Sequence, residues 1–386
     1  MRARGPLVAI PPWLWLWLAL CAAGLPAAVT RWTSMAGAFL GGPGGGLAGW
    51  TVRLLAVVES LPALMLPAAL GTLLLPWLRA RRVHRRHAPV EVPEQILEFT
   101  RRYAPGVAVR GHALPAGRLA AVYPLGWRRP VIAVSPALVR LWHTDRAAAR
   151  IVLAHQLAHC RSGDHLLLGL ASPFVLSSRL APVLVPALGL PGLALLAASR
   201  TVPGDLVVVH AGLLLAALAQ LLLPVAALWS AELAADRFAV ETQGSAGMLT
   251  LSPSRSSPLG ITRPPVRLRR RLATVWASPA GTAAMLAGWP LVYLLLLPLA
   301  VAIGVIGRLL LGDEVRGVWS VAAHYLVMSW PMWLAALVLI GGWPLLAHTW
   351  TRLWTGQRTG ALGTPARAYW TAAALPGLCL LLSLTL

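Results

Sequence analysis

The chain has 386 residues, of which 58% are hydrophobic and only 12% are charged, and its mean hydropathy is +0.70. This composition excludes an ordinary soluble domain and indicates a polytopic α-helical membrane protein. The net charge of +21 does not indicate nucleic-acid binding, because the arginines that carry it cluster at the ends of apolar stretches, as the positive-inside rule expects. All strong cations are arginine, a bias that favours a GC-rich bacterial genome, so we expect a multi-pass protein of a bacterial plasma membrane.

The N-terminal region, residues 1–87, is predicted to contain two membrane spans. Residues 7–28 are apolar and long enough to cross a bilayer, although their alanine-rich end leaves a cleaved signal peptide as an alternative. A second span at 53–78 ends in an arginine cluster at 79–86. Such a cluster marks the cytoplasmic side and is attracted to anionic lipid.

Residues 88–170 form the most polar part of the chain and predict a small domain or a cap at the membrane. The segments 119–123 and 131–134 have the composition of short strands. Thr144-Asp145 then predicts the start of a helix that runs through His159. We assign an α+β domain to residues 88–241.

Two apolar stretches inside this domain, at 180–199 and 206–229, are predicted to cross the membrane and return. The first carries three prolines, so it should be kinked or re-entrant. A basic cytoplasmic loop at 242–281 follows. The C-terminal region, 282–386, holds three further spans, at 283–311, 318–342 and 368–386. Seven spans with the N-terminus inside place every arginine cluster in the cytoplasm.

Three ionisable residues lie inside the predicted spans, namely Glu59, His210 and His324. Ionisable groups in a bilayer are costly and are therefore often functional. They could form one shared polar cluster. Alternatively, each could remain isolated and neutral or extend toward the membrane surface.

The segment His155-Gln-Leu-Ala-His159 is the candidate metal-binding motif of the chain. Two imidazoles four residues apart project from one face of a helix and can share a metal ion. In the usual zinc-peptidase pattern a glutamate follows the first histidine and takes the proton of the metal-bound water. Here that position is Gln156, whose carboxamide accepts no proton near neutral pH. The simpler alternative is a pair of surface histidines hydrogen-bonded to water.

A third ligand is needed, because two side chains leave a tetrahedral site half empty. Glu232 and Asp236, four residues apart, share one helical face further along the chain. The two predicted crossings between them and the histidines return Glu232 to the cytoplasmic side. The sequence therefore predicts one metal site made of His155, His159 and a carboxylate from this segment.

This combination resembles the integral-membrane zinc endopeptidases of the gluzincin type, a group that includes the CAAX-prenyl endopeptidases, the bacterial heat-shock membrane proteases and the β-lactam sensor peptidases. The matching positions are His155, His159, Arg161, Asp164, Glu232, Asp236 and the segment 130–135. The resemblance implies a small cytoplasmic zincin-like metallopeptidase domain with one zinc per chain, bound by His155, His159 and Glu232. It also implies that Asp236 supports the ligands from behind and that a substrate adds as a strand along a sheet edge, for which Val131–Val134 is the expected edge.

Two functions remain open. The first is a membrane-bound zinc metalloendopeptidase that hydrolyses membrane-associated or misfolded proteins, slowed by Gln156 because loss of a general base costs about 10²–10⁴-fold in rate. Asp164 and His165 are the nearest alternative bases. The second is a catalytically inactive zinc-binding membrane regulator or sensor that captures a peptide segment. A transporter built on the intramembrane polar residues has no motif to support it. Cys160 is expected to be a packed thiol rather than a ligand.

Overall fold

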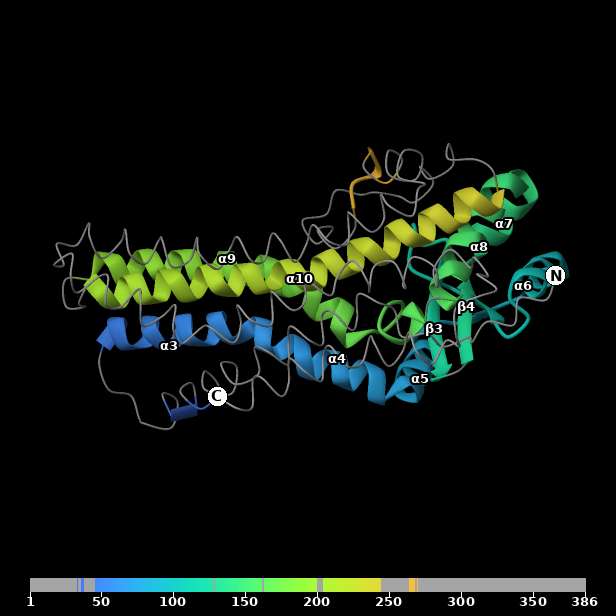
Figure 1. Cartoon of the computed structure of the whole chain (residues 1–386). Helices are drawn as coiled ribbons and strands as arrows, with labels where there is room; N and C mark the ends of the chain where they lie inside the picture. The colour runs from blue at the N-terminus through green and yellow to red at the C-terminus, as the bar shows by residue number, and fades with distance from the viewer. Residues whose placement is uncertain are drawn as a thin grey trace, which may run out of the picture. The chain divides into compact units, whose positions relative to one another are not determined.

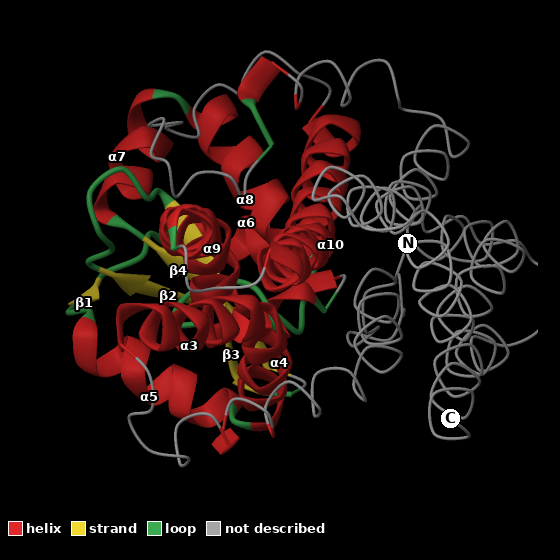
Figure 2. Ribbon diagram, turned by 90° about the vertical axis from the view of Figure 1, so that its left-hand side faces the viewer, coloured by secondary structure: helices red, strands yellow, loops and turns green. Residues whose placement is uncertain are grey.

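The computed structural model describes residues 46–127, 129–161, 163–199, 204–243, 264–267 and 269, together with 33, 36 and 37. In this part the chain is mostly helical and contains one small mixed sheet (Figures 1 and 2). Two compact units share the chain: 1–14, 67–179 and 225–282 in the first, and 15–66, 180–224 and 283–386 in the second. The predicted spans at 7–28, 283–311, 318–342 and 368–386 lie outside the described residues, as does His324.

The sheet of the first unit has four strands in the order β1-β2-β4-β3. Their bounds are Pro89–Val90 for β1, Ala108–His112 for β2, Ala120–Gly126 for β3 and Arg129–Val134 for β4. β2 pairs parallel to β4, and the other two pairings are antiparallel. The two strands predicted from the sequence are confirmed as β3 and β4.

The expectation that Val131–Val134 forms a free sheet edge is wrong. β4 lies between β2 and β3 and is hydrogen-bonded on both sides. All four side chains of this segment are fully buried, as a continuous apolar run in a central strand requires. β1 and β3 are the edge strands instead, and the carbonyl of Val122 in β3 accepts a hydrogen bond from the Leu170 amide at 2.9 Å. Gly169 makes this approach possible, since it has φ +92° and a Cβ would lie 2.0 Å from the Val122 oxygen.

Three helices pack with the sheet around the main core of the first unit: α6 (Glu94–Tyr103), α7 (Pro136–Thr144) and α8 (Arg146–Arg161). The predicted start of α8 is confirmed, because Asp145 Oδ1 accepts a hydrogen bond from the Ala148 amide at 3.0 Å. The apolar face of α8 contributes Ala149, Leu153, Leu157 and Cys160 to this core, each with no exposed surface.

Helix α5 (Pro76–Arg86) contains the arginine cluster that follows the second predicted span. Arg79 is not part of a simple cytoplasmic flank, since its side chain is buried and donates to backbone carbonyls of the loop after α8. The bonds to the oxygens of Leu168 and Leu170 measure 2.6 and 3.2 Å. Burial lowers the pKa of Arg79 to about 9. This arginine therefore fastens α5 to the segment that follows the histidine helix.

The second unit contains α3 (Gly46–Ser60), the short η1 (Leu61–Leu64) and parts of α9 (Pro173–Ala198) and α10 (Gly204–Gln243). Within the described residues, α9 alone is long and apolar enough to cross a membrane. The predicted span at 53–78 is not one helix: it is divided among α3, η1, α4 (Met65–Leu74) and the start of α5.

Two of the three ionisable residues of the predicted spans meet in the second unit. His210 Nδ1 lies 2.8 Å from Glu59 Oε1, and the two residues are only 6% and 3% exposed. The alternative of a shared polar contact is therefore correct for this pair, which joins α3 to α10 across 151 positions of sequence.

Candidate metal centre

Helix α8 supplies the two histidines of the predicted site. The apolar side of α8 packs against the core of the first unit. His155 and His159 are four residues apart and therefore lie together on a different side of the helix. The two Nε2 atoms lie 3.2 Å apart, and the rings meet edge to face at a centroid distance of 4.8 Å. Both side chains are largely buried, at 12% and 5% exposed. The helix therefore directs two nitrogens toward one point.

Helix α10 supplies the third group. Glu232 Oε2 lies 3.5 Å from His155 Nε2, and one ligand atom from each of His155, His159 and Glu232 falls within 4.8 Å of the others. Ligand atoms around a tetrahedral zinc are about 3.3 Å apart, given bonds of about 2.0–2.2 Å. The spacings of His155 Nε2 to His159 Nε2 and to Glu232 Oε2 are close to that value, and all three ligand atoms lie within 4.8 Å of one another.

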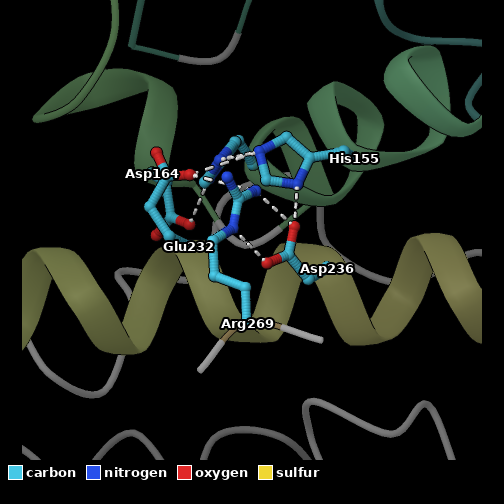
Figure 3. A network of polar contacts seen from close by, with 6 residues as sticks. His155, Asp164, Glu232, Asp236 and Arg269 are labelled. Carbon is cyan, nitrogen blue, oxygen red and sulfur yellow. Dashed lines mark hydrogen bonds and ion pairs between the residues drawn. The ribbon is translucent and has the colours of Figure 1, made fainter. Parts of the chain in front are cut away.

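Each histidine has a buried carboxylate near its other ring nitrogen. His159 Nδ1 is hydrogen-bonded to Asp164 Oδ2 at 3.0 Å, and His155 Nδ1 lies 2.9 Å from Asp236 Oδ1 (Figure 3). A carboxylate hydrogen-bonded to Nδ1, as at His159, fixes the ring orientation and favours the tautomer whose Nε2 lone pair is available to a metal. The charge of Asp236 favours a proton on Nδ1 of His155 in the same way. Gly163, with φ +78°, turns the chain after α8 so that Asp164 faces back toward the helix.

Arg269 joins the site from the basic loop. Its Nε and Nη2 donate to the two oxygens of Asp236 at 2.6 Å each, and Nη2 lies 3.7 Å from Glu232 Oε2. This two-pronged contact holds Asp236 in place behind His155. In the sequence Arg269 is one of several neighbouring arginines, and no local signal separates it from the rest.

The charges of the site favour a divalent cation. The three carboxylates of Asp164, Glu232 and Asp236 lie at the two imidazoles, and the guanidinium of Arg269 contacts two of the three. Several carboxylates gathered among largely buried groups favour the binding of a cation. A divalent metal ion would supply such a charge.

The pKa of His155 reflects the carboxylates beside it. Burial lowers this pKa, but the contacts with Asp236 and Glu232 outweigh burial and raise it to about 9. Asp236 behaves in the opposite sense: burial raises its pKa, and the contacts with His155 and Arg269 outweigh burial and lower it. Without metal, His155 therefore holds a proton that a metal ion would displace.

Neither of the two alternative bases expected from the sequence replaces the general base at Gln156, which is half-buried on α8. Asp164 contacts His159 and acts as its support. His165 is fully buried, and burial followed by the charge of Arg79 lowers its pKa to about 3, so it is a poor proton acceptor. Cys160 is also fully buried, and burial raises the pKa of its thiol, which agrees with the packed thiol expected from the sequence.

Comparison with known proteins adds no relative: no protein-family model, no curated protein and no solved structure matches the chain. The resemblance to membrane zinc endopeptidases consequently rests on the residues of the site.

Proposed function

We propose that this protein is an integral-membrane zinc protein of the gluzincin type that binds one zinc ion through His155, His159 and Glu232. The observation that carries the proposal is the convergence of two Nε2 atoms and one carboxylate, with a second carboxylate behind each imidazole. Zinc sites of metallopeptidases use three protein ligands and leave one position open for water or substrate.

The activity that this site supports best is peptide hydrolysis at a reduced rate. Bound zinc would acidify a water molecule and polarise a peptide carbonyl. In this chain His155 and His159 hold the metal, Asp164 and Asp236 orient them, and Gln156 occupies the position of the proton acceptor. A carboxamide can hydrogen-bond a water molecule but cannot take its proton, so this step is left to solvent. We infer membrane-associated or misfolded proteins as the substrates.

A second function, a zinc-binding regulator or sensor that captures a peptide without cutting it, is favoured by one specific observation. The carboxylates of Asp164 and Asp236 are both engaged in supporting histidines, so neither is available as a substitute base. Peptide hydrolysis by the Gln156→Glu variant would favour the peptidase, because one added carboxylate can create activity only if the protein already positions a substrate at the metal. No hydrolysis by this variant would favour the regulator or sensor.

The proposed setting is a bacterial plasma membrane, crossed seven times, with the metal site in the cytoplasm. The length and apolar character of α9 support a membrane location, and the arginine clusters support the orientation. Single cysteines placed by Ser257→Cys and Gly312→Cys test it: only the second should react with an impermeant thiol reagent added outside. Reaction of the first would overturn the topology.

The experiment that tests the zinc site is metal analysis of the purified full-length protein. Wild-type protein should carry about one zinc per chain, as a three-ligand site with an open position requires. His155→Ala and Glu232→Ala should each lose most of it. His143→Ala is the matched control, since His143 is an exposed histidine on α7 and should leave zinc content unchanged. Equal zinc in all four proteins would overturn the assignment.

A further inference from the structure

The outer face of α5 changes from apolar to cationic along its length. Pro76, Arg79, Ala80 and Val83 form the buried side of the helix. On the exposed side, Trp77 and Leu78 in the first turn are 52% and 47% exposed. The exposed residues Arg81, Arg82 and Arg85 occupy the next two turns. An indole followed by arginines is the arrangement found where a chain passes through the headgroup layer of a bilayer.

A second segment, distant in sequence, reaches the start of the same helix. Trp127 lies at the tip of the β3–β4 hairpin and is 55% exposed. Its indole Nε1 donates a hydrogen bond to the carbonyl oxygen of Leu73 at 2.9 Å. That carbonyl is in the last turn of α4, where the helix breaks before Pro76 and leaves acceptors without helical partners. The sheet and the end of an apolar helix are thus tied together at an exposed indole.

The arginines of this surface have no acidic partners among the residues that the structure describes. Within the described residues, no ion pair joins Arg81, Arg82 or Arg85 to a carboxylate. Leu74 and Leu75, which precede α5, are themselves 56% and 39% exposed. An apolar zone that is followed by unpaired cations matches the change from acyl chains to phosphates at the surface of an anionic bilayer.

We propose that Trp77, Leu78, Arg81, Arg82, Arg85 and Trp127 form an interfacial patch that binds the headgroup layer of an anionic bilayer. The patch fixes the β3–β4 hairpin at the membrane surface. The arginines alone are a common flank of a membrane span, whereas the hairpin tip is part of the folded domain that carries the histidine helix. The proposal rests on the membrane location proposed above and is independent of zinc binding.

The test places a fluorescent label beside Trp127 in the full-length protein in lipid nanodiscs. Cys21 and Cys379 are replaced by serine, buried Cys160 is retained, and Arg129→Cys provides an exposed attachment point two residues from Trp127. Glu98→Cys on α6 is the matched exposed control in the same unit. Unlabelled background is measured on the protein without an introduced cysteine.

Lipids that carry a nitroxide just below the headgroup should quench the label at 129 severalfold more than the label at 98. Phosphatidylglycerol should increase this difference over phosphatidylcholine alone, and Arg81→Gln/Arg82→Gln/Arg85→Gln should remove the increase. Trp127→Ala should reduce quenching at 129, with an unchanged circular dichroism spectrum showing that the fold is retained.

Equal lipid quenching of the two labels would overturn the patch. A label at 129 that is shielded from both lipid nitroxide and aqueous iodide would also overturn it, because a protein would then be the occupant. Failure of the chain to elute with nanodiscs would overturn the membrane location as well, whereas loss of zinc binding would leave the patch untouched.

Discussion

The described residues of the first and second units each include a buried contact between a histidine and a carboxylate, but among them only those of the first unit bring a third ligand group to the same point. In the second unit Glu59 and His210 are joined by a single contact of 2.8 Å. In the first unit His155 and His159 have similar contacts at Nδ1, but their Nε2 atoms converge with Glu232 on one point. A metal site is therefore identified by converging lone pairs rather than by buried histidine–carboxylate contacts.

The number of carboxylates separates the two contacts further. The Glu59–His210 contact joins one carboxylate to one imidazole. In the first unit three carboxylates lie at two imidazoles, and the guanidinium of Arg269 contacts two of the three. The Glu59–His210 pair can link α3 to α10, as buried polar contacts between helices do, whereas several carboxylates around two imidazoles favour a bound cation.

Restoring the base should produce the largest effect. Gln156→Glu is expected to raise zinc-dependent hydrolysis of an unfolded protein substrate by about 10²–10⁴-fold, the usual contribution of a general base. The measurement is proteolysis by purified protein with and without a chelator. Gln156→Asn, which adds no carboxylate, is the control. Equal activity of wild type and the glutamate variant would show that another group removes the proton.

Removing the supports behind the ligands should have the next largest effect. Asp164→Asn and Arg269→Gln are each expected to weaken zinc affinity by about 10–100-fold, because groups that orient metal-bound histidines typically contribute this much. Competition with a fluorescent zinc chelator measures the affinity. Arg267→Gln is the matched control, as Arg267 is exposed in the same segment. Unchanged affinity in the Arg269 variant would show that its contact with Asp236 is only structural.

Zinc affinity should depend on pH through His155. Its pKa is raised to about 9 without metal, so between pH 6.5 and 9 zinc must displace a proton from it. The apparent affinity should fall by up to about tenfold for each pH unit below 9. Isothermal titration in buffers of different ionisation enthalpy would report the released proton. The absence of proton release at pH 7.5 would contradict a protonated His155.

Stability without metal should show a second pH dependence, and it too should decrease as pH falls. The pKa of His165 is lowered to about 3, so below its ordinary value of 6.5 the unfolded chain binds this proton and the folded chain does not. The melting temperature of chelator-treated protein should therefore fall as pH decreases from 6.5 to 4.5. His165→Gln should flatten this trend. An equal slope in both proteins would assign the effect to other groups.

The Glu59–His210 pair should have the smallest influence on the site. Glu59→Gln is expected to reduce stability by about 0.6–1.7 kcal/mol, the range found for polar contacts between membrane helices, and to leave zinc content at the wild-type level. Thermal unfolding in detergent and metal analysis of the same sample measure both quantities. Zinc loss in this variant would mean that the two regions are coupled and that the contrast between them is false.

The sequence by itself determined the local features of the first unit. The start of α8 at Asp145, the four-residue spacing of His155 and His159, and the shared face of Glu232 and Asp236 follow from helical periodicity and capping, which depend on neighbouring residues. The strands near 120 and 130 followed from their composition. The roles within the site that came from the family resemblance, including that of Glu232 as a ligand, remain predictions whose geometry is favourable.

Tertiary structure alone decided the contacts between distant positions. β4 became a central strand because both of its sides are paired, which strand composition does not encode. The partners of Arg79 lie 86 or more positions away in the sequence. Arg269 contacts Asp236 across 33 positions, and Trp127 contacts Leu73 across 54. The residues next to an arginine do not show whether its side chain faces water, a lipid phosphate or a buried carboxylate. The tertiary fold decides this, because a buried charge without a partner is costly and only the paired arrangement is favourable.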